Sequence, residues 1–244
     1  MSNDLLDHFF GEKSTAFALR IVLVPALPLN MFKKHFSKIE KNFNGRPFYS
    51  GFTGKYNGER ISVLSTGVGA TVVGDAVLAL KTVATHFLLA NVAGTLSPEL
   101  QIGDHFIPLR AIDGEGFSRY QQGTHADVLL STRGIEMSPT VRAFCSSLQV
   151  PHGTVYTLGS LHAEQDRTFL ELLKNKGIAA VDLETSAVYA AARTIEATAL
   201  AVQLIDHRPL ERPLYRKGTS TEQLRLNYAV EGFPKTVLDL ACRM

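Results

Sequence analysis

The segment from residue 179 to residue 195 constrains the fold more than any other part of this chain of 244 residues. An apolar run ends there at Asp182-Leu183-Glu184, and the apolar residues that follow have helical spacing. This pattern predicts a buried strand that leads directly into a helix, with Glu184 at the start of the helix. In open α/β sheets such a junction is where ligands bind. The alternative is that Asp182 and Glu184 only complement the dipole of the helix that they precede.

Other continuous apolar runs predict further buried strands, as in a sheet that is covered on both faces. These runs are residues 19–24, 86–92 and 198–205. Two more strands are expected at residues 47–55 and 59–65. Between them, Asn57-Gly58 favours a hairpin turn because both residue types accept positive φ.

Helices are expected over residues 30–43 and 70–85. With 45% hydrophobic residues the chain can bury a full core, so we expect one α/β domain over residues 1–244 with a central twisted mixed sheet. Residues 119–133 are polar with little periodicity and predict a loop near the site. Residues 210–220 are basic and rich in turn formers, which predicts a flap beside the site.

Composition excludes several functional classes. The 25 basic and 23 acidic residues are too balanced to indicate a nucleic-acid surface. Cys145 and Cys242, the two cysteines of the sequence, provide neither a disulfide framework nor metal-ligand spacing. The acidic N-terminal residues lack a signal-peptide pattern, and no apolar run approaches the length of a membrane span. We therefore expect a soluble cytoplasmic protein without metal, other cofactor, nucleic-acid or membrane partner.

The sequence from Val181 to Tyr189, Val-Asp-Leu-Glu-Thr-Ser-Ala-Val-Tyr, resembles the Glu-Met-Glu segment of the nucleoside phosphorylase superfamily. This superfamily includes purine and uridine phosphorylases and methylthioadenosine nucleosidase. The resemblance covers nearly the whole chain and is also carried by Ser65-Thr-Gly-Val-Gly69 and by the strand and Gly-rich loop of residues 86–104. It implies a three-layer α/β/α phosphorylase-like fold and a homo-oligomer, either a dimer or a hexamer of dimers. The implied reaction is cleavage of a nucleoside N-glycosidic bond by phosphate or water.

The resemblance assigns the ribose to Glu184, because the last Glu of the family segment holds the ribose hydroxyls. Two vicinal hydroxyls can donate to the two oxygens of one carboxylate. Leu183 replaces the Met that packs on the sugar. His8 matches a His that, in uridine phosphorylases, reaches into the neighbouring subunit to the ribose 5′-hydroxyl. Gly94 is expected to bring its backbone against the base.

Gln165 and Arg167 match the Gln and Arg with which uridine phosphorylases read the uracil edge. Uracil offers two carbonyl acceptors that flank an N–H donor. An amide can both donate and accept, and a guanidinium can stabilise a carbonyl that gains charge, so Arg167 is also a candidate catalytic residue. Leu161 replaces the Phe that stacks on the base. By themselves, without the family, Gln165 and Arg167 favour an exposed helix start.

Asp206 follows the apolar run of residues 198–205 and resembles the catalytic Asp with which purine phosphorylases and nucleosidases protonate purine N7. Its spacing from Glu184 is one residue shorter than in that family. The resemblance therefore allows a purine nucleoside hydrolase with Asp206 as the acid. The water-activating Glu of nucleosidases has no counterpart in residues 26–30.

The phosphate site of the family is altered. Gly67 and Gly69 can still present backbone N–H groups to an anion. Uncharged residues replace two family arginines, a hydroxyl residue and a glycine: they are Asn30, Leu89, Val92 and Ala26. Neither Leu89 nor Val92 can bind an anion. We therefore expect weak or altered phosphate binding. The hypotheses are a uridine phosphorylase-like enzyme with a doubtful phosphate acceptor, a purine nucleoside hydrolase, and a nucleoside-binding protein without turnover.

Overall fold

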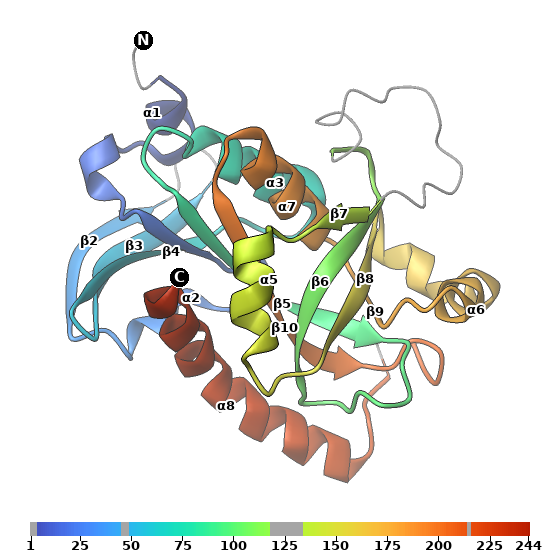
Figure 1. Ribbon diagram of the computed structural model, residues 1–244. Coiled ribbons are helices and arrows are strands. Elements are labelled where there is room, and N and C mark those ends of the chain that lie inside the picture. The colour runs from blue at the N-terminus through green and yellow to red at the C-terminus, as the bar shows by residue number, and fades with distance from the viewer. Residues whose placement is uncertain (1–3, 45–48, 118–133, 214–215) are drawn as a thin grey trace.

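The computed structural model describes residues 4–44, 49–117, 134–213 and 216–244 (Figure 1). The strands are β1 Arg20–Leu23, β2 Lys38–Asn44, β3 Ser50–Tyr56, β4 Glu59–Ser65, β5 His86–Thr95, β6 His105–Gly114, β7 Gly134–Glu136, β8 His152–Leu158, β9 Ala180–Asp182 and β10 Thr198–His207. The helices are α1 Asp4–Phe10, α2 Leu29–Lys33, α3 Ala70–Ala79, α5 Pro139–Ser146, α6 Arg167–Asn175, α7 Thr185–Thr194 and α8 Ser220–Arg243.

The described strands form one mixed sheet in the order β10-β6-β8-β9-β5-β1-β4-β3-β2, with β7 paired to β6. Because β10 also pairs with β5, the strands β5, β9, β8, β6 and β10 close into a ring, and the others continue from it as an open sheet. The ring brings the ends of β9 and β10 to the two sides of Gly94, which pairs with Val181 on one side and His207 on the other.

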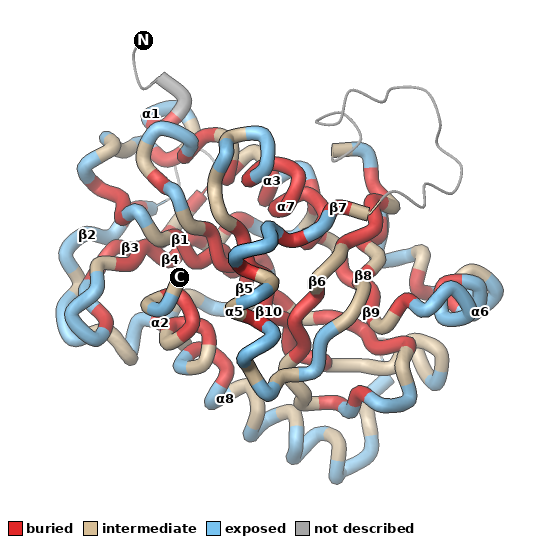
Figure 2. Tube along the Cα trace, viewed as in Figure 1, coloured by how far each residue is buried: buried red, intermediate tan, exposed pale blue. Residues whose placement is uncertain are grey.

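Helices pack on both sides of the sheet, so the expected α/β fold with a central mixed sheet is confirmed. Figure 1 shows α3 and α7 side by side above the sheet, whereas α8 runs along its opposite side. The central strands are buried over most of their length, and α8 exposes its outer face (Figure 2). Burial of the apolar runs in β1, β5 and β10 against these helices provides the main driving force for folding.

The predicted hairpin is confirmed, since Asn57 and Gly58 join β3 and β4 with φ of 49° and 84°. The helix expected over residues 30–43 is wrong. Helix α2 ends at Lys33, and β2 follows as an edge strand that pairs with β3. In β2 only Phe43 is buried, so the strand lacks the apolar alternation that reveals a strand in sequence.

Two other expectations concern a loop and a helix. The predicted loop of residues 119–133 falls outside the described ranges. The helix expected over residues 70–85 ends at Ala79, followed by turns as far as Ala84. No helix in the described ranges is long and apolar enough to cross a membrane.

Candidate functional site

Glu184 lies between β9 and α7, as the sequence predicts, and is only 4% exposed. Its Oε1 accepts a hydrogen bond from the backbone N–H of Gly69 at 2.9 Å. Its Oε2 accepts from Asn91 Nδ2 at 3.1 Å and from the backbone N–H of Leu183 at 3.3 Å. The carboxylate therefore joins the turn before α3, strand β5 and the start of α7.

Asp182 is the last residue of β9, two residues before Glu184, and is surrounded by donors. Within the described residues its carboxylate accepts five hydrogen bonds, from Thr157 Oγ1, Thr185 N, Thr185 Oγ1, Asn91 Nδ2 and Gln203 Nε2. The side chains come from β5, β8, α7 and β10, which meet around the N-terminus of α7. The positive end of the helix dipole there favours negative charge.

The two carboxylates influence each other because both are buried. Burial raises the pKa of Asp182, while hydrogen bonds from Thr185, Thr157 and Asn91 oppose that rise. Burial and the neighbouring charge of Asp182 raise the pKa of Glu184 to about 7. Across the described ranges, no Lys or Arg forms an ion pair with either acid. The pair is thus a negative centre stabilised by neutral donors, and Glu184 takes up a proton near neutral pH.

The predicted anion-binding glycines flank this centre. Gly67 and Gly69 have φ of 78° and 120°, values that favour glycine over any residue with a side chain. The N–H of Gly69 points to Glu184. This N–H is therefore engaged by a carboxylate, and the role of both glycines in binding an anion stays a prediction.

A second buried acid cluster lies at the end of β10. His207 places Nδ1 at 2.5 Å from Asp206 Oδ1 and Nε2 at 2.8 Å from Glu164 Oε2. Burial alone lowers the pKa of His207, but the hydrogen bonds and charges of Asp206 and Glu164 outweigh burial and raise it to about 9. At neutral pH the ring is therefore an imidazolium that donates from both nitrogens.

Gly94 lies directly beside this cluster. A Cβ on Gly94 would lie 2.6 Å from His207 Nε2 and 3.1 Å from Pro209 Cδ, so only glycine fits there. The pairing of β10 with β5 shifts register between Ile205 and His207, and such irregularities re-aim side chains. In this structure His207 and Pro209 cover Gly94, and the contact between Gly94 and a base stays a prediction.

The residues assigned to the uracil edge lie on the surface. Gln165 and Leu161 are exposed, and the side chain of Arg167 is 71% exposed. Arg167 pairs with Glu171 at 2.9 Å and donates to the carbonyl of Leu210 at 2.9 Å. Gln165 and Arg167 thus lie at an exposed helix start, which is what these residues favour without the family. Their base-binding and catalytic roles stay predictions.

The inward-facing residue of this segment is Glu164, in the short 3₁₀ turn Leu161–Gln165. The sequence patterns did not indicate Glu164, Asn91 or His207 as site residues. A 3₁₀ turn has three residues per turn, so the inward position differs from that of an α-helix. The available signal was Asp206-His207 at a strand end.

The remaining ribose candidates lie apart from each other. Leu183 is half-buried against a small apolar cluster beneath α6. His8 lies exposed on α1 with its ring edge against Phe9. Neither forms a side-chain hydrogen bond with Glu184 within the described residues.

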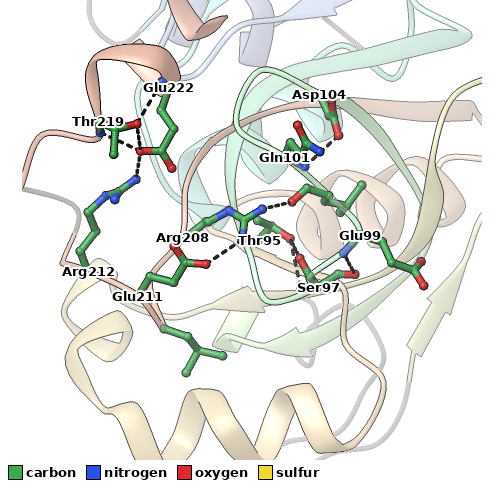
Figure 3. A network of polar contacts seen from close by, with 12 residues as sticks. Thr95, Ser97, Glu99, Gln101, Asp104, Arg208, Glu211, Arg212, Thr219 and Glu222 are labelled. Atoms are coloured by element: carbon green, nitrogen blue, oxygen red, sulfur yellow. Dashed lines mark hydrogen bonds and ion pairs between the residues drawn. The ribbon is translucent and has the colours of Figure 1, made fainter.

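The segment after β10, which leads into the expected basic flap of residues 210–220, is anchored by Arg208 and Arg212 (Figure 3). Arg208 donates to the carbonyl of Leu100 at 2.8 Å and pairs with Glu211 at 2.7 Å. Arg212 pairs at 2.5 Å with Glu222, which also closes the N-terminal capping box of α8. Both guanidinium groups are thus committed to protein acceptors.

No group of His, Cys, Asp and Glu side chains in the described ranges is arranged to hold a metal ion. Cys145 is a buried thiol and Cys242 a half-buried one.

Known proteins with similar sequences and structures define the family. The model of the phosphorylase superfamily matches residues 20–224, and the chain therefore belongs to this superfamily. A DeoD-type purine nucleoside phosphorylase from Buchnera aphidicola subsp. Schizaphis graminum is 25% identical over 205 residues, which cover 82% of this chain and 86% of that protein.

Two solved structures share the fold. Uridine phosphorylase from Vibrio fischeri ES114 superposes with a TM-score of 0.77 at 20% identity, covering 95% of this chain and 94% of that chain. AMP nucleosidase from Bacteroides thetaiotaomicron VPI-5482 gives a TM-score of 0.69 at 20% identity, covering 96% of each chain. At these identities the likeness shows the fold alone.

Proposed function

We propose that this protein cleaves the N-glycosidic bond of a ribonucleoside and that Glu184 holds the ribose hydroxyls. The observation that carries the proposal is a carboxylate, buried at a strand-to-helix junction, that is held by neutral donors. Cleavage in this superfamily passes through a ribosyl group with cationic character. A preorganised negative centre formed by Asp182 and Glu184 would stabilise that charge as it develops.

Phosphate is a poor candidate for the acceptor. A phosphate dianion needs cations or free donors to replace its hydration. The Gly69 N–H points to Glu184, Arg208 and Arg212 are paired, and Leu89 is part of the core. These contacts support weak phosphate binding, with turnover by water, by slow phosphorolysis or by another acceptor.

For the base, the geometry supports a purine better than uracil. Protonation of purine N7 needs a titratable group inside the pocket, and Asp206 lies in a largely buried cluster beside Gly94. Gln165 and Arg167, which would read uracil, are exposed. The uridine-specific enzyme remains the second candidate, because it follows from the residue matches of the 160–167 segment.

We further propose a cytoplasmic homo-oligomer, in which His8 would reach the site of a neighbouring subunit. Val68, 55% exposed beside Gly69, and Val72, 39% exposed on α3, support an apolar contact there. Analytical ultracentrifugation of the wild type and of Val68→Asp tests this assembly. A monomer in the wild type would contradict it.

The main test is incubation with a panel of ribonucleosides and 2′-deoxyribonucleosides, with and without phosphate, followed by identification of the sugar product. Free ribose indicates hydrolysis, and ribose 1-phosphate indicates phosphorolysis. Calorimetric titration with phosphate alone completes the comparison. Tight phosphate binding with rapid ribose 1-phosphate formation would overturn the acceptor assignment. Nucleoside binding without any product would indicate a binding protein.

The site residues are tested by variants. Glu184→Gln removes a charge-assisted hydrogen bond to the ribose, of about 1.5–3 kcal/mol, so ribonucleoside affinity should fall about 10- to 100-fold. The 2′-deoxyribonucleoside should lose less. Competition between adenosine and uridine, repeated with Asp206→Asn and Gln165→Ala, identifies the base. A preference for uridine that Gln165→Ala abolishes would reverse the purine assignment.

A further inference from the structure

Asn91 occupies a position in β5 at which one side chain reaches both buried acids. It is 1% exposed. Its Nδ2 lies 3.0 Å from Asp182 Oδ2 and 3.1 Å from Glu184 Oε2. An amide nitrogen has two hydrogens, so one Asn91 side chain donates to the two carboxylates at once.

This bridge matters because the site is rich in acids. Asp182 lies beside Glu184, Glu115 accepts a hydrogen bond at 2.7 Å from Ser186, two residues after Glu184, and α3, which packs against α7, carries Asp75. The charge of Asp182 disfavours the ionisation of Glu184. A neutral amide that donates to a carboxylate favours its charged form and fixes its orientation. Asn91 therefore favours the charged form of Glu184, which Asp182 disfavours.

The orientation of Asn91 also leaves an acceptor without a partner. Its Oδ1 is buried and forms no hydrogen bond within the described part of the chain. A buried carbonyl without a partner is unfavourable, and an apolar side chain of the same shape would avoid it. The amide is thus oriented by the two carboxylates rather than by packing.

We propose that Asn91 is a positioning residue that keeps Glu184 ionised and oriented toward the ribose hydroxyls through an amide shared with Asp182. The inference rests on the proposed function for the ribose contact. The effect of Asn91 on the ionisation of Glu184 can be measured without any nucleoside.

Gln203 provides a matched control. It faces Asn91 across the β5–β10 pairing, is fully buried, and donates from Nε2 to Asp182 Oδ2 at 3.0 Å. Its second hydrogen goes to Thr185 Oγ1 at 3.0 Å. Its Oε1 also lacks a partner within the described residues. Gln203 thus shares the burial, the amide and the Asp182 contact of Asn91, but it does not bond to Glu184.

The experiment compares Asn91→Leu with Gln203→Met, two nearly isosteric changes that each remove one amide. Glutamate labelled with ¹³C at the carboxyl carbon is titrated by NMR, and Glu184→Gln identifies the Glu184 signal. The wild-type midpoint should lie near pH 7. Asn91→Leu should raise it by about one pH unit. Gln203→Met should leave the Glu184 midpoint unchanged or lower it. Asp182 loses a donor in this variant, so its charged form is less stable and opposes the ionisation of Glu184 less.

Binding of adenosine and of 2′-deoxyadenosine is then measured by calorimetry across the same pH range. Asn91→Leu should weaken adenosine binding about fivefold at pH 7 and recover most of it about two pH units higher, because Glu184 is then ionised. Binding of 2′-deoxyadenosine should change less. If Asn91→Leu does not fold, Asn91→Ser is used. Its hydroxyl has one hydrogen and cannot bridge both acids, so the same shift is expected.

The outcomes separate the two hypotheses. An unchanged Glu184 midpoint in the Asn91 variants, or an equal rise in Gln203→Met, overturns the role of Asn91 even if nucleosides bind. If the midpoint rises as expected but the wild type binds no nucleoside, the proposed function and the ribose contact fail, and the control of Glu184 ionisation by Asn91 stands.

Discussion

Two buried acid clusters lie close to β5, and they hold their carboxylates in opposite ways. Around Asp182 and Glu184 the donors are amides, hydroxyls and backbone N–H groups, and no cation from the described residues takes part. At the end of β10, the imidazolium of His207 lies between Asp206 and Glu164.

The difference shows that the donors around a buried acid decide which group of the cluster has its pKa shifted. With neutral donors, burial and Asp182 bring the pKa of Glu184 to about 7, so a small change in its surroundings changes its charge. The other cluster contains its own counter-ion, and there the shifted group is His207, with a pKa of about 9. The first arrangement suits a ligand that brings hydroxyls or positive charge. The second places an imidazolium and two carboxylates beside Gly94, where the proposed base would lie.

The largest effect is expected from His207→Leu, which leaves two carboxylates without their cation. Removing one partner of a buried ion pair typically costs about 3–5 kcal/mol. Urea unfolding at pH 7 measures the loss of stability. His105→Leu is the control, since His105 is half-buried against Phe233 without a comparable carboxylate pair. Similar losses in the two variants would show that the cluster at β10 is no ion-pair site.

Glu184→Gln is expected to change stability in the opposite direction from His207→Leu, with a gain at high pH. Folding raises the pKa of Glu184 from 4.5 to about 7. Its contribution to stability is therefore fully present below pH 4.5 and is lost as the pH rises through about 7. The loss is about 3 kcal/mol, at 1.36 kcal/mol for each pKa unit. Glu184→Gln should thus be more stable than the wild type by up to that amount above pH 7, relative to the difference at pH 4.

The measurement is a series of unfolding curves between pH 4 and pH 8. Glu171→Gln serves as the exposed control and should show no such gain. A stability difference that stays constant between pH 4 and pH 8 would mean that folding does not raise the pKa of Glu184, and the contrast between the clusters would disappear.

His207 should act in a different pH window. Folding raises its pKa from 6.5 to about 9, so its stabilising contribution is fully present below pH 6.5 and is lost as the pH rises through about 9. The destabilisation caused by His207→Leu should therefore shrink by about 3 kcal/mol between pH 6 and pH 10. Unfolding curves of the wild type and the variant at both pH values test this. A constant difference would argue that the ring is uncharged.

The smallest effect is expected at Arg167. It forms an exposed pair with Glu171, and such pairs contribute about 0–1 kcal/mol. Arg167→Ala should change the free energy of unfolding by less than about 1 kcal/mol and should leave adenosine affinity unaltered. Asp206→Asn provides the buried comparison in the same competition assay. A selective loss of uridine binding in Arg167→Ala would place a base next to the exposed segment after all.

Local sequence patterns predicted much of this protein. The apolar runs predicted β1, β5 and β10, Asn57-Gly58 predicted the hairpin, and the change of periodicity placed Glu184 at the start of α7. Each of these features depends on residues within one strand or one helical turn. The prediction failed for residues 38–44, because an exposed edge strand is stabilised by backbone pairing with β3 and leaves little apolar pattern.

The tertiary structure decided what surrounds Glu184 and which residues face inward. Asn91 and Gly69 are distant from Glu184 in sequence. Asn91 meets it because β5 pairs with β9, and Gly69 meets it because α3 packs against α7. The pairing of β10 with β5 brings His207 onto Gly94, and the 3₁₀ turn buries Glu164 while exposing Gln165. Strand register and ring closure are set by contacts between distant segments, which local periodicity does not record. The sequence by itself therefore determined where the central carboxylate lies, and only the fold decided its charge, its donors and its neighbours.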